Sequence, residues 1–356
     1  MAQFHTLTVQ DIRQETADCV SVAFAVPDEL KETFAFTQGQ YITLRTQLKG
    51  EEVRRSYSLC VSPLDGEWRV AIKTVPGGLF STYANEQLQI GDQLEAMPPE
   101  GRFYTQLDPQ QTRRYVAFAA GSGITPIISI IKTVLETEPL SHFTLFYGNQ
   151  RTESIIFREL IEGLKNTHLN RLSVHYLLSR EHTGSDLFSG RIDAEKCRQF
   201  CQKLFQPTVI DAYFLCGPEA MTLAVRDELK VQGVAANKIH LELFGTSAKA
   251  RRRPKKTQKT NTGFAAEIEL QLDGNRIAFT MTNPDETILD AALRHGADLP
   301  FACKGGVCCT CRAKLEAGTA DMAVNFALEP EEVEAGFTLS CQAYPTSDKI
   351  VVNFDV

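Results

Sequence analysis

The hydrophobic and polar positions of this 356-residue chain follow one pattern at its start and another in its middle. Over the first hundred residues, short segments in which apolar and polar residues alternate are separated by turn residues, and only 79–88 has the spacing of a helix. Such alternation is typical of strands with one buried face, and a series of short strands predicts a small antiparallel β-barrel. The expected strands are 6–12, 19–26, 41–46, 56–60, 68–75 and 93–96.

From Tyr115 the pattern changes to strands that alternate with helices. Apolar runs followed by helical spacing are typical of parallel strands joined by crossover helices, so this part of the chain predicts a doubly wound α/β domain. The expected strands are 115–119, 143–147, 172–178 and 212–215, and the expected helices begin at Thr125 and lie near 154–165 and 220–232.

A third pattern follows a stretch of basic residues. Residues 245–262 contain seven Lys or Arg and no acid, whereas residues 263–356 contain 15 acidic and six basic residues, a net charge of −9. The acidic part begins with a hairpin around Asp273-Gly274, and a helix follows from Thr287. These changes predict a β-barrel domain at 1–107, an α/β domain at 108–244, a linker at 245–262 and an α+β domain at 263–356.

The basic linker has more than one interpretation. A solvated, flexible connection accounts for its composition. Alternatively its cations contact an acidic surface, for which the neighbouring domain is a candidate. A nuclear signal or an RNA-binding patch is a third interpretation, although no aromatic residue interleaves with the cations. The cations are Lys249, Arg251, Arg252, Arg253, Lys255, Lys256 and Lys259.

Composition and charge exclude several classes of protein. The apolar content of 43% and the charged content of 23% are ordinary for globular proteins, and a net charge of −7 argues against nucleic acid as a partner. Residues 115–131 carry no charge, but Gly121, Gly123 and Pro126 interrupt them, so we expect a strand and a helix start here and no membrane span. Ten cysteines without a signal-peptide pattern indicate a reducing compartment, and we expect a soluble cytoplasmic protein.

The most specific chemistry in the sequence lies in four cysteines near its end. Cys303, Cys308 and Cys311 have the spacing C-x₄-C-x₂-C, and Cys341 follows after a gap of 29 residues. This spacing is typical of the ferredoxin loop in which four thiolates hold a [2Fe–2S] cluster. Such a cluster carries one electron at a time, so the rest of the chain should show where electrons enter.

Other residues of the same loop bear on this interpretation. Gly305 and Gly306 let the backbone approach the sulfurs and point N–H groups at them. A structural zinc site is one alternative, although such sites usually contain two Cys-x₂-Cys pairs and only Cys308 and Cys311 have that form. A chance grouping of reduced thiols is another. Cys309 breaks the ligand spacing, and we interpret it as a small space-filling residue.

A motif in the barrel domain suits a flavin nucleotide. Arg55-Ser-Tyr57-Ser58 offers a guanidinium for a phosphate and a flat aromatic side chain for a flat ring, although four residues alone also fit an ordinary strand. The motif resembles Arg-x-Tyr-Ser, the flavin signature of the ferredoxin–NADP reductase superfamily. The resemblance implies that Arg55 neutralises the pyrophosphate of FAD, that Tyr57 packs on the isoalloxazine ring and that the Ser58 hydroxyl forms a hydrogen bond near N5.

Two further segments of this domain resemble the same superfamily. Gly77-Gly78-x-x-Ser81 leads into the expected helix, whose N-terminal N–H groups suit an anion, and it is similar to the family's flavin-pyrophosphate loop. Gly101-x-Phe103 resembles the loop that closes the family's barrel.

The start of the α/β domain carries a glycine-rich turn. Gly121-Ser-Gly123-Ile-Thr125-Pro126 follows an expected strand and opens a helix, which is the context that a nucleotide pyrophosphate site requires. The turn departs from G-x-G-x-x-G by ending in proline, and G-x-G-x-x-P is the form found in this reductase superfamily.

The end of the α/β domain carries the expected nicotinamide site. Cys216-Gly217-Pro218 resembles the family's motif beside the nicotinamide, although a buried cysteine by itself is usually inert packing. Glu242-Leu-Phe244 resembles the Glu-x-aromatic ending of the plant-type reductases, in which the aromatic ring covers the flavin. An edge strand with one solvated carboxylate is the alternative, and the chain continues past Phe244, unlike the family ending.

The choice of nicotinamide dinucleotide depends on the residues after the third α/β strand. Ser179-Arg180 resembles the pair that holds the 2′-phosphate of NADP in this superfamily, and a guanidinium suits that dianion. No acid takes the place of Ser179 to bind a free ribose, although Glu181 lies close in the sequence. We therefore expect NADPH, with NADH as the alternative.

The order of parts is similar to that of the reductase components of multicomponent oxygenases, and to those of phenylacetyl-CoA epoxidases in particular. The resemblance implies FAD and not FMN, a β-grasp ferredoxin domain, a di-iron oxygenase as partner and a role in aerobic phenylacetate degradation. Electrons would pass from NADPH to FAD, to the [2Fe–2S] cluster and to the oxygenase, with Ser58, Cys216 and Glu242 as candidate catalytic residues.

Two alternative functions remain. One is an NADH-dependent reductase of a ring-hydroxylating dioxygenase or of another multicomponent oxygenase. The other is a non-catalytic redox sensor or interaction protein that has kept the fold, although the chain retains the residues of each of the expected sites.

Overall fold

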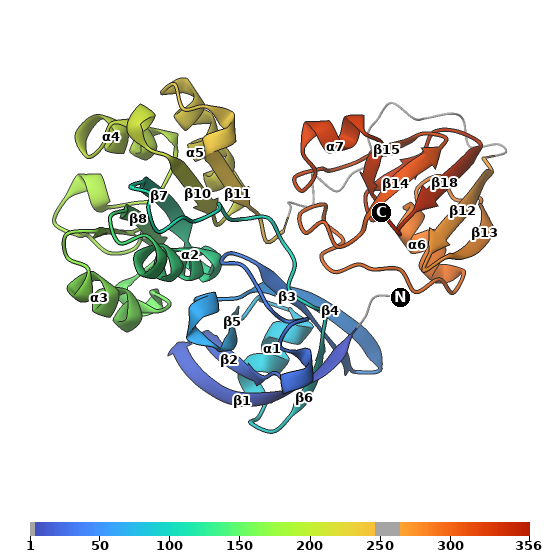
Figure 1. Ribbon diagram of the computed structural model, residues 1–356, viewed down its shortest axis with the longest axis horizontal. Helices are drawn as coiled ribbons and strands as arrows, with labels where there is room; N and C mark the ends of the chain where they lie inside the picture. Colours follow the sequence, from blue (N-terminus) through green and yellow to red (C-terminus); the bar gives the residue numbers. More distant parts are fainter. Residues whose placement is uncertain (1–3, 246–263) are drawn as a thin grey trace. The chain divides into compact units, whose positions relative to one another are not determined.

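The computed structural model describes residues 4–245 and 264–356. Contacts divide the described residues into two compact units, one of His5–Leu243 and one that contains Phe4 and the described residues from Phe244 to Val356 (Figure 1). The expected basic linker at 245–262 lies outside the described residues, except for Gly245.

The first part of the larger unit is a six-stranded antiparallel sheet in the order β4-β3-β6-β1-β2-β5. An isolated bridge joins Leu59, directly after β4, to Val70 on β5, so that the two edge strands meet and the sheet closes on itself. Alternate side chains fill its interior, which confirms the predicted barrel. Its elements are β1 (His5–Thr16), β2 (Cys19–Ala25), β3 (Tyr41–Leu48), β4 (Glu51–Ser58), β5 (Trp68–Lys73), α1 (Leu79–Glu86) and β6 (Gln93–Ala96).

The strand that carries the flavin motif begins earlier than we expected. Strand β4 starts at Glu51 and ends at Ser58, whereas the sequence pattern predicted 56–60. Four of its first five residues are charged, so the alternation that identifies a strand is weak there. Pairing with β3 along its full length holds this polar stretch in the sheet.

The second part of the larger unit is a five-stranded parallel sheet in the order β11-β10-β7-β8-β9. Helices α2 and α3 cover one face and α4 and α5 cover the other (Figure 1), which confirms the doubly wound α/β prediction. Its elements are β7 (Arg114–Ala120), α2 (Ile124–Thr137), β8 (His142–Asn149), α3 (Arg158–Thr167), β9 (Leu172–Leu178), α4 (Ala194–Lys203), β10 (Ala212–Cys216), α5 (Glu219–Val231) and β11 (Ile239–Glu242).

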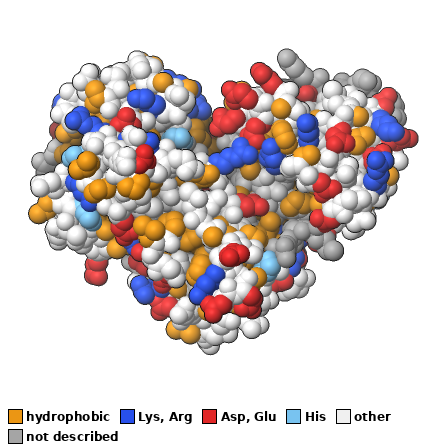
Figure 2. All heavy atoms as spheres, in the orientation of Figure 1, with side chains coloured by type: hydrophobic (Ala, Val, Ile, Leu, Met, Phe, Trp, Pro, Cys, Tyr) orange, Lys and Arg blue, Asp and Glu red, His pale blue; other side chains and the backbone are white. Residues whose placement is uncertain are grey.

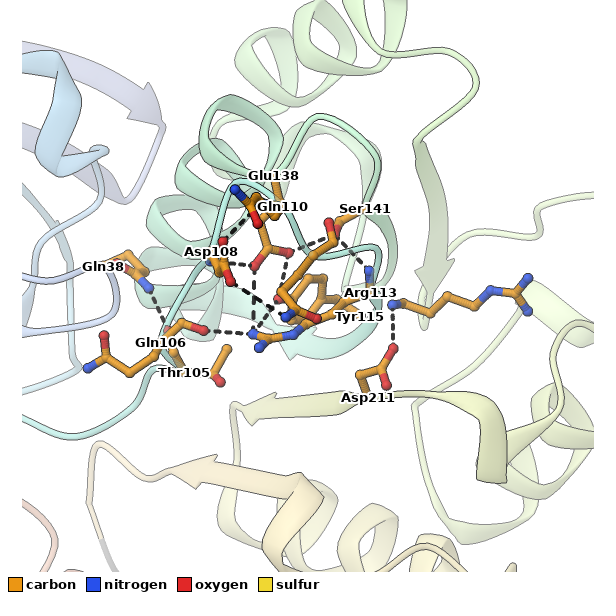
Figure 3. Close-up of polar contacts among 12 residues, drawn as sticks. Gln38, Thr105, Gln106, Asp108, Gln110, Arg113, Tyr115, Glu138, Ser141 and Asp211 are labelled. Carbon is orange, nitrogen blue, oxygen red and sulfur yellow. Dashed lines mark hydrogen bonds and ion pairs between the residues drawn. The ribbon is translucent and has the colours of Figure 1, made fainter.

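The buried carboxylate of Glu138, which is 0% exposed, holds the segment that connects the two sheets in place. It accepts hydrogen bonds from the Tyr115 hydroxyl at 2.9 Å, the Ser141 hydroxyl at 2.6 Å and the Asp108 backbone N–H at 3.1 Å (Figure 3). The Arg113 guanidinium forms an ion pair with it at 3.6 Å. Glu138 therefore ties the interdomain connection to the end of α2.

A polar stripe on α2 contacts the barrel directly. The Ser129 hydroxyl donates to the Val61 carbonyl at 2.6 Å and accepts from the Gly39 N–H at 3.4 Å. One turn further, Lys132 forms an ion pair with Asp65 at 2.5 Å. Since α2 also follows the glycine-rich turn, these contacts fix that turn relative to the barrel.

The C-terminal unit contains a mixed five-stranded sheet, in the order β13-β12-β18-β14-β16, and a small sheet of β15 and β17. The β12–β13 hairpin turns at Asp273-Gly274, as predicted, with both residues at positive φ. Helix α6 packs on the sheet, and acidic side chains are exposed around α7 (Figure 2). The elements are β12 (Ala266–Leu272), β13 (Asn275–Met281), α6 (Ile288–Arg294), β14 (Arg312–Ala317), β15 (Ala320–Met322), α7 (Pro330–Glu334), β16 (Phe337–Leu339), β17 (Ala343–Pro345) and β18 (Lys349–Asn353).

Candidate functional site

The three residues of the flavin motif lie at the end of β4. Arg55 is exposed, Tyr57 is partly buried and Ser58 is buried. The Tyr57 ring packs on Phe80 of α1, with the ring centroids 5.5 Å apart, and burial raises the pKa of its phenol. Tyr57 is therefore held as a neutral aromatic surface, with the Arg55 cation two residues before it on the same strand.

The loop before α1 is closed by Ser81. Its hydroxyl accepts a hydrogen bond from the Val75 N–H at 3.0 Å and lies 3.4 Å from the Gly78 carbonyl. Gly77 has a φ of 74°, which favours glycine, and a Cβ on Gly78 would lie 2.7 Å from the Ser81 Oγ. The three residues thus form one tight turn at a helix start, as a phosphate loop requires.

The glycine-rich turn lies between β7 and α2. The Tyr147 hydroxyl donates to the Gly121 carbonyl at 3.0 Å, and the Thr125 hydroxyl donates to the Ser122 carbonyl at 3.0 Å. A Cβ on Gly123 would lie only 2.1 Å from the backbone oxygen of Cys216, so this position accepts no other residue without a shift of the backbone. Pro126 is buried in the first turn of α2, where proline has no helical N–H to lose.

The three candidate catalytic residues come together at the carboxyl ends of β4, β10 and β11. The Ser58 hydroxyl donates a hydrogen bond to Glu242 Oε2 at 3.3 Å, and Glu242 pairs in register with Cys216 on the neighbouring parallel strand. Burial raises the pKa of Glu242 to about 8, and the bond from Ser58 opposes that rise. Burial, and then the charge of Glu242, raise the pKa of the fully buried Cys216 thiol, which is neutral.

Two other residues of the Cys216 motif shape the same corner. A Cβ on Gly217 would lie 2.7 Å from the Met221 side chain and 3.2 Å from Ala120, so the chain passes closely over the end of β7. Pro218 precedes the first residue of α5 and is exposed. Gly217 therefore leaves no room for a side chain between the segment after Cys216 and the end of β7.

Ser179 and Arg180 lie at the far edge of the sheet from Cys216. Strands β7 and β8 separate β10 from β9, so the two positions are about 14 Å apart at the usual strand spacing. Arg180 is exposed, and no hydrogen bond or ion pair within the described part of the chain engages its guanidinium. The edge formed by these strand ends suits an extended dinucleotide.

Phe244 falls in a different compact unit from the residues above. It belongs to the C-terminal unit, and its side chain is 47% exposed. The expected covering of the flavin by Phe244 stays a prediction.

The C-terminal unit gathers the four predicted ligand cysteines. Hydrogen bonds from Cys308 and Cys341 lower the pKa of Cys303, and contact with Cys303 and Cys311 raises that of Cys341. The contacts therefore join Cys303 to both Cys308 and Cys341, and Cys341 also to Cys311. Among the residues that the structure describes, no three metal-binding side chains converge on a single-ion site. A binuclear cluster needs no such convergence when each iron takes two thiolates.

Backbone groups around these thiols fit a cluster. The Gly305 N–H points at Cys303 Sγ, 3.3 Å away, as the sequence predicted. Gly306 has a φ of 74°, and a Cβ there would lie 2.7 Å from the Val324 carbonyl, so only glycine allows the loop to fold tightly. The Gln342 amide donates toward Cys341 Sγ at 3.6 Å. Gln342 was not predicted from the sequence, where its position next to Cys341 is the only signal.

Cys309 binds a backbone carbonyl 18 residues further along the chain. Its Sγ donates to the Ala327 carbonyl at 2.9 Å, and its φ of 57° is unusual for a residue with a side chain. This bond joins the cysteine loop to the segment before α7.

Residue types and spacing therefore fit three groups: a flavin nucleotide on the barrel, a nicotinamide dinucleotide at the edge of the parallel sheet, and a binuclear iron–sulfur cluster in the C-terminal unit. Comparison with protein families gives the same order. The oxidoreductase FAD-binding domain matches residues 6–104, the oxidoreductase NAD-binding domain matches 118–227, and the 2Fe-2S iron-sulfur cluster binding domain matches 270–346.

Two solved structures share the fold over nearly the whole chain. Phthalate dioxygenase reductase aligns with a TM-score of 0.58 and 20% identity, over 99% of this chain and 98% of its own. An intact type IV self-sufficient cytochrome P450 monooxygenase aligns with a TM-score of 0.71 and 21% identity, over 98% of this chain and 41% of its own. At these identities the likeness shows the fold alone.

In the described ranges, none of the helices has the length and apolar character to cross a bilayer.

Curated relatives share the sequence over the same length. One subunit of the 1,2-phenylacetyl-CoA epoxidase of Escherichia coli (strain K12) is 44% identical over 100% of this chain and 99% of its own. The ferredoxin reductase component of 3-ketosteroid-9-alpha-monooxygenase from Rhodococcus rhodochrous is 33% identical over 98% of this chain and 96% of its own. The chain therefore belongs to the family of NAD(P)H-dependent electron-transfer reductase components that combine FAD-binding, NAD-binding and 2Fe-2S domains.

Proposed function

We propose that this chain passes electrons from NADPH through FAD and a [2Fe–2S] cluster to the di-iron oxygenase of a phenylacetyl-CoA epoxidase, and so serves aerobic phenylacetate degradation in the cytoplasm. The choice of partner is supported by the 44% identity to the phenylacetyl-CoA epoxidase relative over the full chain. The site chemistry is supported by one observation above all, the hydrogen bond at 3.3 Å from Ser58 on the barrel to Glu242 on the parallel sheet. That bond supports the proposal because it joins the end of β4, which carries Arg55 and Tyr57, to the end of β11, which pairs with Cys216.

In this proposal each site residue binds or orients one group. Arg55, with the turn of Gly77, Gly78 and Ser81, receives the flavin pyrophosphate, and Tyr57 packs on the ring. The turn that contains Gly121, Gly123, Thr125 and Pro126 receives the pyrophosphate of the dinucleotide. Gly217 and Pro218 shape the nicotinamide site, Phe244 covers the flavin, and the metal ligands are Cys303, Cys308, Cys311 and Cys341.

Ser58, Cys216 and Glu242 line the position where the hydride passes. Because the pKa of Glu242 is raised to about 8, its carboxyl is neutral at pH 7 and adds no negative charge where a hydride arrives. The neutral Cys216 thiol fills the neighbouring space and excludes water. When bound, the flavin accepts electrons in pairs and releases them singly, which suits a one-electron cluster. For the domains we propose the boundaries 1–107, 108–244 and 263–356, joined by a linker at 245–262.

Reconstitution tests the proposed partner. The purified reductase should support turnover of phenylacetyl-CoA when it is mixed with the oxygenase subunits of a phenylacetyl-CoA epoxidase and NADPH, and it should support a ring-hydroxylating dioxygenase poorly. Efficient turnover only with the dioxygenase would favour the second candidate function, an NADH-dependent reductase of another multicomponent oxygenase. The 33% identity to the ketosteroid monooxygenase component supports another multicomponent oxygenase as the partner in that candidate.

Kinetics test the proposed dinucleotide. The Arg180→Ala variant should lose most of its preference for NADPH over NADH in kcat/KM, because the guanidinium acts only on the 2′-phosphate. An unchanged preference would contradict the assignment of Ser179 and Arg180.

A further inference from the structure

The backbone segments that follow β8 and β9 stay paired beyond the ends of the strands. The Ser179 N–H donates to the Asn149 carbonyl at 3.0 Å, and the Arg180 N–H donates to the Gln150 carbonyl at 2.9 Å. The residues proposed to bind the 2′-phosphate are therefore fixed against the loop after β8.

This pairing brings Thr152 against Glu181. The Thr152 N–H donates to Glu181 Oε1 at 3.2 Å, and the Thr152 hydroxyl donates to Glu181 Oε2 at 2.7 Å. Both carboxylate oxygens are thus bound by one residue. Glu181 lies beside Ser179 and Arg180 in the sequence, but nothing there connects it with Thr152, which lies 29 residues away.

Glu181 is an anion in a basic environment. The hydrogen bond from the Thr152 hydroxyl, together with the charges of Arg151 and Arg158, lowers its pKa, so the carboxyl is ionised at neutral pH. Arg151, Arg158 and Arg180 are all exposed, and no hydrogen bond or ion pair engages their guanidinium groups within residues 4–245 and 264–356.

A carboxylate in this position competes with a phosphate. Guanidinium groups form paired hydrogen bonds with carboxylates as readily as with phosphates. If Glu181 were unrestrained, its oxygens would turn to the nearby guanidinium groups and occupy the donors that a 2′-phosphate needs. Each oxygen accepts one bond from Thr152, which orients the carboxylate toward the loop after β8 and leaves the guanidinium donors available.

We propose that Thr152 is a positioning residue that sets dinucleotide specificity, by holding Glu181 away from the guanidinium groups of Arg151, Arg158 and Arg180 and so leaving them available to the 2′-phosphate. The proposal rests on the proposed NADPH specificity. The proposal adds Thr152 and Glu181 to the specificity residues Ser179 and Arg180. It gives the loop after β8 a role in choosing the dinucleotide.

Binding of two small probes tests the role of Thr152 apart from electron transfer. Calorimetry with the FAD- and cluster-loaded protein should give a lower dissociation constant for 2′,5′-ADP than for 5′-ADP. In the Thr152→Val variant the dissociation constant of 2′,5′-ADP should rise about fivefold, as expected for loss of one hydrogen bond, and that of 5′-ADP should change less than about twofold. The Thr152→Ser variant, which keeps the hydroxyl, should restore the wild-type values.

A second substitution separates positioning from a general structural effect. In a Glu181→Gln background, Thr152→Val should leave 2′,5′-ADP binding unchanged, because no carboxylate remains to be held. Steady-state kinetics should show the same pattern, with KM for NADPH raised and kcat unchanged. The matched control is Thr167→Val, since Thr167 is exposed and, among the described residues, its hydroxyl binds only the Gly163 carbonyl in α3.

The outcomes distinguish this proposal from the one on which it rests. Equal dissociation constants of the two probes in the wild type would contradict NADPH specificity. A wild-type preference for 2′,5′-ADP that Thr152→Val leaves unchanged, or an equal loss in the Glu181→Gln background, would overturn the role of Thr152 alone.

Discussion

The Ser58 hydroxyl and the Glu242 carboxyl are joined by a hydrogen bond of 3.3 Å across 184 residues of sequence. Ser58 ends a strand of the barrel and Glu242 ends a strand of the parallel sheet. Their contact joins the barrel to the parallel sheet within the larger unit, and the protonation state of Glu242 decides the charge at that point.

The reaction with NADPH should depend on the ionisation of Glu242. Its pKa of about 8 lies above the ordinary value of 4.5, so the carboxyl is neutral below pH 8 and becomes an anion above it. An anion beside the arriving hydride is unfavourable, and the rate of flavin reduction should fall by about tenfold as the pH rises through this pKa. Stopped-flow absorbance from pH 6 to 10 measures the rate. The Glu242→Gln variant should show no such transition, and an unchanged transition would exclude Glu242 as its source.

Ser58 should set the position of that transition. Its hydrogen bond stabilises the ionised form of Glu242 and so lowers the pKa, against the larger effect of burial. The Ser58→Ala variant should therefore move the pH transition of flavin reduction to higher pH. A transition that stays in place, or moves to lower pH, would contradict a hydrogen bond between the two side chains.

Gly123 should tolerate no side chain. A Cβ at this position would lie 2.1 Å from the Cys216 backbone oxygen, so Gly123→Ala must separate the glycine-rich turn from the end of β10. We expect a loss of about 1–3 kcal/mol in unfolding free energy, as for other overpacked sites, and weaker NADPH binding. Urea unfolding and calorimetry measure the two effects. Gly163→Ala is the matched control because a Cβ there meets nothing within 4 Å, and in a helix it should slightly stabilise the protein.

Much of this arrangement could be predicted from the sequence. The Gly121–Gly123 turn and the cysteine spacing are local patterns, in which neighbouring residues satisfy one geometric requirement. Helix α4 could not be recognised, since its buried residues are Cys197, Phe200 and Cys201 among charged and polar neighbours. Its apolar stripe is therefore too narrow to stand out from the surrounding polar positions.

The contacts that complete the site could not be predicted. Ser58 with Glu242 and Thr152 with Glu181 are pairs of ordinary polar residues far apart in the chain, and only the register of the strands brings them together. Glu138 belongs to the same class, because its pattern in the sequence is that of a solvated carboxylate at the end of a helix.

Glu138 should be essential for stability. Its carboxylate is fully buried and accepts hydrogen bonds from Tyr115, Ser141 and Asp108 (Figure 3). The Glu138→Ala variant leaves these donors buried without an acceptor, so we expect a loss of about 2–4 kcal/mol in unfolding free energy, measured by urea titration. Glu159→Ala, at an exposed position of α3, should change it by less than about 0.5 kcal/mol. Similar losses of unfolding free energy in both variants would contradict the role of Glu138 in holding the segment between the two sheets.

Substitution of a ligand cysteine should remove the cluster, whereas substitution of Cys309 in the same loop should not. The Cys303→Ser variant should lose the visible absorption of the cluster and the NADPH-driven reduction of an electron acceptor that depends on it, while flavin reduction by NADPH continues at its former rate. The flavin and nicotinamide motifs lie in the other compact unit, which explains why flavin reduction should persist. Cys309→Ser is the matched control. The hydroxyl can still donate to the Ala327 carbonyl, which the thiol binds at 2.9 Å, so the cluster and its electron transfer should be retained. Loss of the cluster in Cys309→Ser, with retention in Cys303→Ser, would reverse the ligand assignment.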